Sequence, residues 1–168
     1  IVSNYPSIAQ TLYNEIQNAE YVANNDNIVL AQINYQISAL KNAIETAEVE
    51  IVKAKIDAIG EVEFTNESKE RIDSAYEAYL DLSDEEQERV TNYAKLVSAQ
   101  EEYEALAIDH AAANIVIMKI NSIGVITYVG KTNPKIEEAR TAFNALTINQ
   151  KMLVVNFNML LTAENTYN

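Results

Sequence analysis

The sequence predicts an all-α protein in which tandem three-helix bundles share a long continuous helix and follow an N-terminal helical hairpin. One observation is a stretch that recurs: LSDEEQERVTNYAKL at 82–96 returns as LTINQKMLVVNFNML at 146–160. A second is that apolar residues recur at spacings of three and four, which places them on one face of a helix. A third is that 168 residues include only three Gly and two Pro, a scarcity typical of long helices.

The composition narrows the functions that the chain can have. Its net charge of −13 argues against a nucleic-acid partner, because phosphate binding needs clustered Lys and Arg. It has no Cys, which excludes disulfides and thiolate metal sites. It lacks an apolar run of about 18 residues, so we expect no membrane insertion. The start at Ile1 has neither Met nor an apolar leader, and we therefore expect a segment of a longer protein without a signal peptide.

Residues 1–46 are predicted to form a helical hairpin, which could be part of a module of another type. Its two apolar stripes are Ile8, Leu12, Ile16, Ala19 and Ile33, Ile37, Leu40, Ile44. Between them NNDN at 24–27 is typical of a turn, because Asn tolerates left-handed backbone conformations. Tyrosines of this segment have no counterpart in the repeat, and we take four of them as a candidate binding face: Tyr5, Tyr13, Tyr21 and Tyr35.

Residues 47–110 and 111–168 are predicted to be two copies of one three-helix unit. Aligned without gaps at an offset of 64, residues 51–103 and 115–167 are identical at 15 of 53 positions. The shared residues are mainly apolar or small and fall on three helical stripes, so the two units preserve a core. Their surfaces differ, since residues 47–110 carry 18 acids and 6 bases and residues 111–168 carry 3 acids and 5 bases.

Matched residues also mark the helix ends. Gly60 and Gly124 follow the first helix of each unit, where a left-handed residue is favoured. Asn133 followed by Pro134 is typical of a helix start.

Two stretches have the form of a capping box, in which a Ser or Thr and a Glu or Gln three residues later bond each other's backbone. They are Ser83 with Glu86 and Thr147 with Gln150. No Gly or Pro occurs from Asp84 to Ile123. We therefore expect one helix of about 40 residues that both units share, as in spectrin-type rods.

Asn92 and Asn156 are matched polar residues on apolar stripes. As structural residues, they would each bond a loop backbone, after Gly60 or Gly124, and fix the helix register. As functional residues, they would make the same ligand contact twice. We favour the structural role.

We expect no catalytic, cofactor-binding or metal-binding residue, and no enzyme activity. His110 is the one histidine. A metal site or general-base catalysis would need further residues beside it, and we favour a satisfied or solvent-facing histidine. The acidic run at 81–88 lacks the loop pattern that wraps Ca²⁺ and suits a helix N-terminus. No Asp or Glu is identical in both units, so the units share no carboxylate for glycosidase chemistry.

The repeat resembles a helical module common in secreted and cell-surface proteins of low-GC Gram-positive bacteria. That module's pattern is I-x-A-I-G, then A-R-x-A-Y-x-x-L-[ST], then V-x-N-x-x-x-L-x-x-A-E-x-x-Y. The first unit reads IDAIG, AYEAYLDLS and VTNYAKLVSAQEEY, with Tyr76 and Gln100 where the module has Arg and Glu. The second unit has Arg140 and Glu164 there. The match covers about residues 50–168, and residues 1–46 are similar, more weakly, to small helical modules found in various surface-protein architectures.

The resemblance implies a non-catalytic spacer or stalk in a larger exported protein, located outside the cell at its surface or wall. It implies no cofactor, and its partners would be the neighbouring domains of the parent chain. We expect a monomer. The alternative is a binding module for a carbohydrate, such as a cell-wall glycan, or for a host or partner protein.

Overall fold

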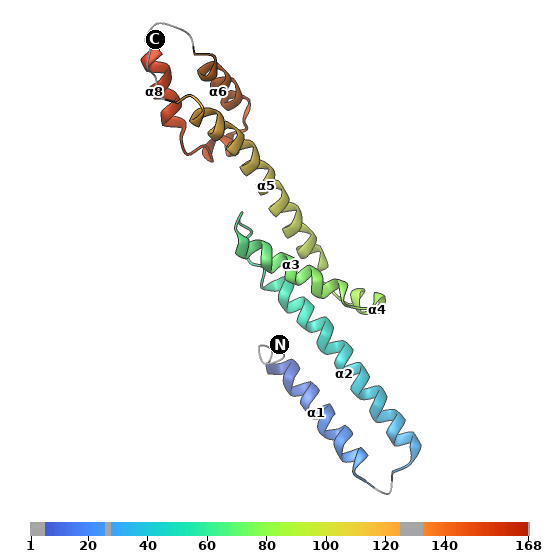
Figure 1. Ribbon diagram of the computed structural model, residues 1–168. Coiled ribbons are helices and arrows are strands. Elements are labelled where there is room, and N and C mark those ends of the chain that lie inside the picture. Colours follow the sequence, from blue (N-terminus) through green and yellow to red (C-terminus); the bar gives the residue numbers. More distant parts are fainter. Residues whose placement is uncertain (1–5, 26–27, 125–132, 168) are drawn as a thin grey trace. The chain divides into compact units, whose positions relative to one another are not determined.

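The structure is a computed structural model that describes residues 6–25, 28–124 and 133–167. Every regular element in these ranges is a helix, so the all-α prediction is confirmed. In chain order the helices are α1 (Pro6–Ala23), α2 (Leu30–Asp57), α3 (Asn66–Leu80), α4 (Asp84–Gln87), α5 (Tyr93–Asn121), α6 (Pro134–Ala145), α7 (Ile148–Met152) and α8 (Phe157–Tyr167) (Figure 1). The chain divides into unit 1 (Ile1–Glu101) and unit 2 (Glu102–Asn168), and the boundary falls within α5. The predicted limits after residues 46 and 110 fall inside α2 and α5.

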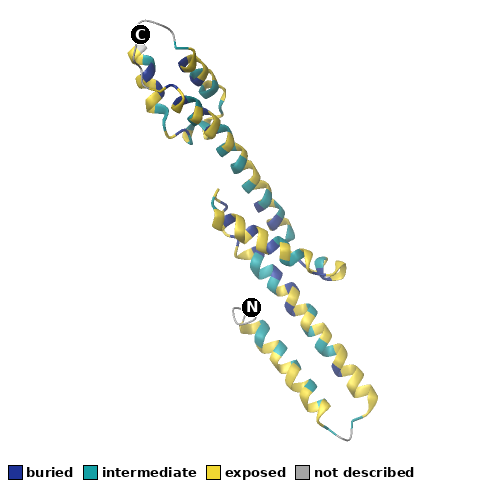
Figure 2. Cartoon of the chain, viewed as in Figure 1, coloured by how far each residue is buried: buried dark blue, intermediate teal, exposed yellow. Residues whose placement is uncertain are grey.

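In unit 1, α1 and α2 form a hairpin of two antiparallel helices (Figure 1). Gln36 on α2 is buried in this contact and donates from Nε2 to Glu15 Oε2 at 3.1 Å. No residue of α1 is buried, and Figure 2 shows this helix in teal and yellow only. The hairpin is therefore held by half-buried side chains and a polar contact rather than by a closed core.

The apolar stripe predicted for α2 is not the face that meets α1. Gln36, Ala43 and Ala47 lie on the α1 side of α2, at i, i+7 and i+11. Beside them, Ile37 and Ile44 remain 61% and 41% exposed. The sequence pattern thus identifies an apolar face on α2 that α1 leaves uncovered.

The core of unit 1 forms where the second half of α2 meets α3, α4 and the first turns of α5. Its most deeply buried side chains are Val49, Val52, Ile56, Ile59, Ile72, Ala75 and Leu96. Each fully buried Ile or Leu stabilises the fold by roughly 1.5–3 kcal/mol. The stripes predicted for the three repeat helices, which are α2, α3 and α5 in this unit, therefore supply the packed residues.

Unit 2 has an equivalent core between the end of α5 and helices α6 to α8. Its buried residues are Ala113, Val116, Ile120, Ile123, Ile136, Ala139, Val154, Leu160 and Ala163. Most lie 64 positions after a buried residue of unit 1, such as Leu160 after Leu96. The repeat in sequence is thus a repeat in packing.

The predicted helix of about 40 residues from Asp84 to Ile123 is wrong. The chain leaves the helix after Gln87 and enters α5, which has 29 residues, at Tyr93. In the turn between them the N–H of Val90 bonds the Gln87 carbonyl at 3.0 Å, and Val90 is buried. Unit 2 breaks in the same way between α7 and α8, around the buried Val154. A buried valine thus lies at each break. Neither break contains a Gly or Pro that would indicate it in the sequence.

The predicted helix ends are present. Gly60 and Gly124 have φ of 70° and 69°. A Cβ on either residue would meet no atom within 4 Å, so the left-handed backbone and not a lack of space favours glycine. Asn133 caps α6 by accepting from the N–H of Lys135 at 3.1 Å, one residue after Pro134.

Both predicted capping boxes are formed, at the starts of α4 and α7. In unit 1, Glu86 Oε2 accepts from the N–H of Ser83 at 2.8 Å and from its hydroxyl at 2.6 Å. In unit 2, the N–H of Thr147 donates to Gln150 Oε1 at 3.0 Å, and the N–H of Gln150 donates to Thr147 Oγ1 at 3.3 Å. These boxes fix where the chain turns after α3 and α6.

A basic side chain bonds the end of the first repeat helix in each unit. Comparing only identical residues between the two units does not reveal this contact, because one cation is Arg and the other is Lys. Arg71 donates from Nε to the carbonyl of Ile59 at 3.0 Å, and Lys135 donates from Nζ to the carbonyl of Ser122 at 2.8 Å. Each cation therefore bonds a carbonyl at the C-terminal end of the first repeat helix, where positive charge is favourable. Arg71 and Lys135 are 64 residues apart, so a comparison of charge could have found them.

Candidate functional site

Asn92 and Asn156 make the same contact in the two units. Asn92 Nδ2 donates to the carbonyl of Lys53 at 2.9 Å, and Asn156 Nδ2 donates to the carbonyl of Ile117 at 3.0 Å. Both acceptors lie inside a helix, so the predicted partner, a loop after Gly60 or Gly124, is wrong. A helical carbonyl has a second lone pair, so the amide can bind it without breaking the helix.

The residue one turn further along each acceptor helix completes this contact. Asn156 Nδ2 also donates to Asn121 Oδ1 at 2.9 Å. In unit 1 the equivalent residue is Asp57, whose pKa is lowered by hydrogen bonds from Asn92 first and Lys95 second. Lys95 Nζ lies 3.2 Å from Asp57 Oδ1. The contact ties the start of the third repeat helix to the first in both units.

An aromatic pair accompanies the asparagine in each unit. Tyr79 stacks on Tyr93, and Phe143 stacks on Phe157, each with ring centroids 4.1 Å apart. Burial is the main reason that the pKa of Tyr79 is raised, and the neighbouring Tyr93 adds to it. These rings belong to the packing and are not a free aromatic surface.

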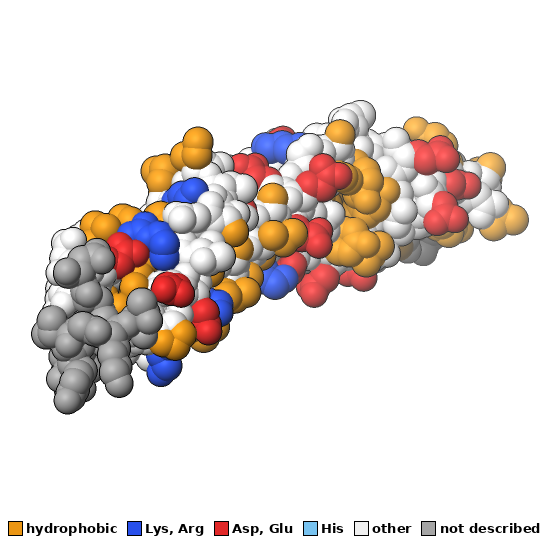
Figure 3. All heavy atoms as spheres, turned by 90° about the horizontal axis from the view of Figure 1, so that it is seen from above, with side chains coloured by type: hydrophobic (Ala, Val, Ile, Leu, Met, Phe, Trp, Pro, Cys, Tyr) orange, Lys and Arg blue, Asp and Glu red, His pale blue; other side chains and the backbone are white. Residues whose placement is uncertain are grey.

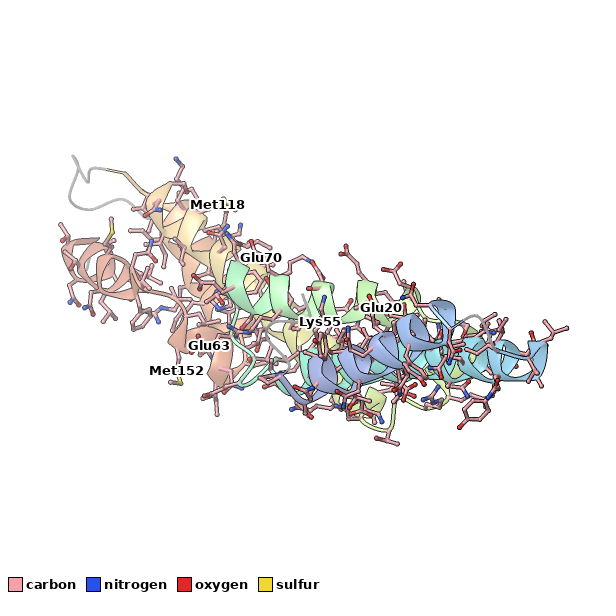
Figure 4. The ribbon with its side chains drawn as sticks, turned by 90° about the horizontal axis from the view of Figure 1, so that it is seen from below. Glu20, Lys55, Glu63, Glu70, Met118 and Met152 are labelled. Carbon is pink, nitrogen blue, oxygen red and sulfur yellow. The ribbon has the colours of Figure 1, made fainter. Side chains whose placement is uncertain are left out.

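Lys55 and Lys119 are the other matched polar side chains. Lys55, labelled in Figure 4, donates from Nζ to Ser74 Oγ at 3.0 Å. Lys119 Nζ lies 3.9 Å from Glu138 Oε2, and Glu138 is the residue equivalent to Ser74. Both lysines thus connect the first and second helices of their unit.

The candidate tyrosine face lies on the N-terminal hairpin. Tyr21 and Tyr35 are 71% and 75% exposed and line one hollow of about 430 Å³ between the end of α1 and the start of α2. Tyr13 is exposed but does not line that hollow, and Tyr5 lies outside the described residues. The remaining lining residues are Val22, Asn25, Ile28, Ala31, Gln32 and Gln36. The hollow therefore combines two exposed aromatic rings with side-chain amides.

A larger groove of about 830 Å³ lies on the other side of α2, against α4. Its apolar residues are Ile37, Leu40 and Ile44 of α2. Its charged residues are Lys41, Glu45, Glu48, Asp84, Glu85 and Glu86. Figure 3 shows how exposed hydrophobic side chains (orange) lie beside acidic ones (red) on one face of the molecule. Sequence reasoning missed this groove, because it forms only when α4 folds back against α2.

Two carboxyl groups in the groove influence each other. The pKa of Glu48 is raised, first by its partial burial and then by the negative charge of Glu86. The pKa of Glu86 is lowered, mainly by its hydrogen bonds from Ser83. Among the described residues, Glu86 Oε1 is buried without a hydrogen-bond partner. The side chains of Glu48 and Glu86 lie close enough to share a hydrogen bond when one of them is protonated. Among the described residues the groove is lined by five acidic side chains and one lysine, so its lining carries an excess of negative charge.

Across the described ranges, no three His, Asp or Glu side chains gather closely enough to hold a metal ion. His110 lies on α5 and is half-buried. None of the helices in residues 6–25, 28–124 and 133–167 is long and apolar enough to cross a membrane. The chain matches no protein-family model, no curated protein and no solved structure.

Proposed function

We propose that the chain is a non-catalytic spacer of a larger exported bacterial surface protein, built as tandem three-helix bundles that share α5. One observation carries the proposal: residues 64 apart make the same internal contacts. Asn92 and Asn156, the two aromatic stacks and the two capping boxes all repeat. A repeated ligand site would also preserve exposed polar residues, and here the matched polar side chains are used inside the units.

The contrast between the surfaces of the two units supports the same role. Residues 47–110 carry 18 acids and 6 bases, and residues 111–168 carry 3 acids and 5 bases. Selection for a spacer acts on the packing that keeps each unit folded and on the continuity of the joining helix, and it leaves surface charge free to change.

The test is whether α5 holds the two units at a defined separation. The chain has no Cys, so the exposed and equivalent residues Glu77 and Thr141 can be changed to cysteine and spin-labelled. We expect pulsed electron-spin resonance to give a narrow distance distribution. Three glycines inserted after Glu102 should broaden it, because they interrupt α5. A broad distribution in the chain without the insertion would overturn the spacer proposal.

A second candidate function is carbohydrate binding at the hollow lined by Tyr21 and Tyr35. The observation that favours it is the combination there of two exposed rings, which can stack on sugar faces, with the exposed amide of Gln32, which can bond hydroxyls. A glycan array that includes bacterial cell-wall polysaccharides tests it. Binding that Tyr21→Ala and Tyr35→Ala abolish, and that Tyr13→Ala leaves unchanged, would support this function. Absence of saturable binding would reject it.

A further inference from the structure

The apolar stripe of α2, exposed at its three isoleucines and half-buried at Leu40, has the geometry of half a helix–helix interface. Ile33, Ile37, Leu40 and Ile44 follow one another at i, i+4, i+7 and i+11. At 1.5 Å per residue the stripe is about 16 Å long, which is about three helical turns. This alternation of four and three residues is the seam that packs a second helix in coiled-coil fashion. α1 lies on another side of α2, so the seam stays open.

The charges around the stripe indicate what kind of helix fits. Glu45 and Glu48 follow the stripe on α2, and Asp84 and Glu85 face them from the start of α4. Of the residues that the structure describes, Lys41 is the one cation in the groove lining, and it already lies 3.5 Å from Glu45. The charge of Arg89 also acts on Glu86, but the lining still has more carboxylates than cations. An apolar strip beside this excess of carboxylates complements an amphipathic helix whose apolar face is flanked by Lys or Arg.

We propose that the groove between α2 and α4 binds a basic amphipathic helix of a partner protein. The apolar face of that helix would pack on Ile37, Leu40 and Ile44. Its cations would lie over Glu48, Asp84 and Glu85. The groove shares Ser83 and Glu86 with the capping box of α4. The six side chains proposed to meet the partner helix take no part in the repeated contacts, so the proposal does not rest on the spacer function.

A second copy of this chain is a poorer occupant. The most exposed apolar side chains of unit 2, Ile148, Met152 and Val155, lie beside the cation Lys151. However, α7 has only five residues, so it offers about one turn against a stripe of about three. The chain as a whole is acidic, which opposes self-association at an acidic groove.

A helical peptide tests the proposal on the whole chain. The probe has leucines at i, i+4, i+7 and i+11 and lysines at the flanking positions, and an otherwise identical peptide with glutamates is its control. We expect fluorescence anisotropy to show saturable binding of the lysine peptide only, weakening as salt is added. The variant Glu48→Lys and the variant Ile37→Asp should each weaken binding at least tenfold.

Matched variants show whether the groove itself is responsible. Glu70→Lys places the same charge change on the exposed face of α3 (Figure 4), and Ile148→Asp places the same apolar-to-acidic change on unit 2. Both should leave binding unchanged, and circular dichroism should show that every variant is folded. Absence of binding, equal binding of the glutamate peptide, or equal weakening by Glu70→Lys would overturn the proposal. So would a dimer in sedimentation that Ile37→Asp dissociates, since a second copy would then fill the groove.

Discussion

Arg140 on α6 and Glu164 on α8 form a two-pronged ion pair that unit 1 does not have. Arg140 Nε donates to Glu164 Oε1 at 2.6 Å, and Nη2 bonds Oε2. The guanidinium carbon also lies 5.2 Å from the ring centroid of Phe157. The equivalent residues of unit 1 are Tyr76 and Gln100, which cannot form this pair. In unit 2 an ion pair therefore links α6 to α8, the second and third repeat helices.

We expect Glu164→Gln to lower the free energy of unfolding of unit 2 by about 1 kcal/mol at neutral pH, since the pair is half-buried. Hydrogen bonds from Arg140 lower the pKa of Glu164 in the folded state. The pair therefore stabilises the fold above the pKa of the unfolded carboxyl, and this stability is lost as pH falls through the lower folded pKa. Urea unfolding at stepped pH should show the variant and the wild type converging in acid.

Asp73→Asn is the matched control, because it removes an ion pair with Lys69 whose side chains are 54% and 51% exposed. Its cost should stay below about 0.5 kcal/mol. A gap between Glu164→Gln and the wild type that persists unchanged in acid would show that the shape of this side chain, and not its charge, stabilises unit 2.

Asn92→Asp and Asn156→Asp should destabilise their units by similar amounts, about 1–3 kcal/mol each. The substitution replaces the Nδ2 donor by an oxygen that faces the carbonyl of Lys53 or Ile117. In unit 1 it also sets a second carboxylate beside Asp57. Urea unfolding measures the cost, and Asn158→Asp on the exposed side of α8 is the control. If both variants were as stable as the wild type, the structural role would be wrong, and the alternative that these asparagines contact a ligand would be favoured.

The features that the sequence could predict are those set by residues close in the chain. The capping boxes at Ser83 and Thr147 depend on residues three apart, and the left-handed turn at Gly60 depends on one residue. The packed stripes could be found because the repeat shows the same apolar positions twice. The chemistry of neighbouring residues, together with a second copy of the unit, was therefore enough to predict the helix ends and the packed stripes.

The features that the sequence could not predict depend on contacts distant in the chain. The helix breaks before Tyr93, where Val90 is buried and the side chain of Asn92 reaches α2. The helix propensities of Val and Asn are only moderately unfavourable, so these residues do not by themselves predict a break. The apolar spacing of Ile37 and Ile44 is identical whether or not another helix covers them. The groove between α2 and α4 likewise appears only once the chain has turned back after α3.

Gly60→Ala and Gly124→Ala should each cost about 1–2 kcal/mol of stability. The reason is the left-handed backbone at φ of 70° and 69°, since an added methyl group meets no neighbouring atom. Gly60→Asn separates these two causes, because Asn adds a larger side chain but tolerates the conformation better. Thermal unfolding should therefore rank glycine above asparagine and asparagine above alanine. An asparagine variant less stable than the alanine variant would point to a steric cause instead.

Glu48→Gln should stabilise the chain at neutral pH, although it removes a charged surface group. Partial burial, and then the charge of Glu86, raise the pKa of Glu48 in the folded state. The ionised carboxyl therefore opposes folding above that raised pKa, and the penalty shrinks as pH falls and is gone below the ordinary pKa of an unfolded Glu. The urea midpoint of the variant should exceed that of the wild type at pH 7, and the two should meet in acid. Glu70→Gln on the exposed face of α3 is the control and should change the midpoint little. A Glu48→Gln variant that is less stable than the wild type at pH 7 would show that the ionised carboxylate is favourable in this groove.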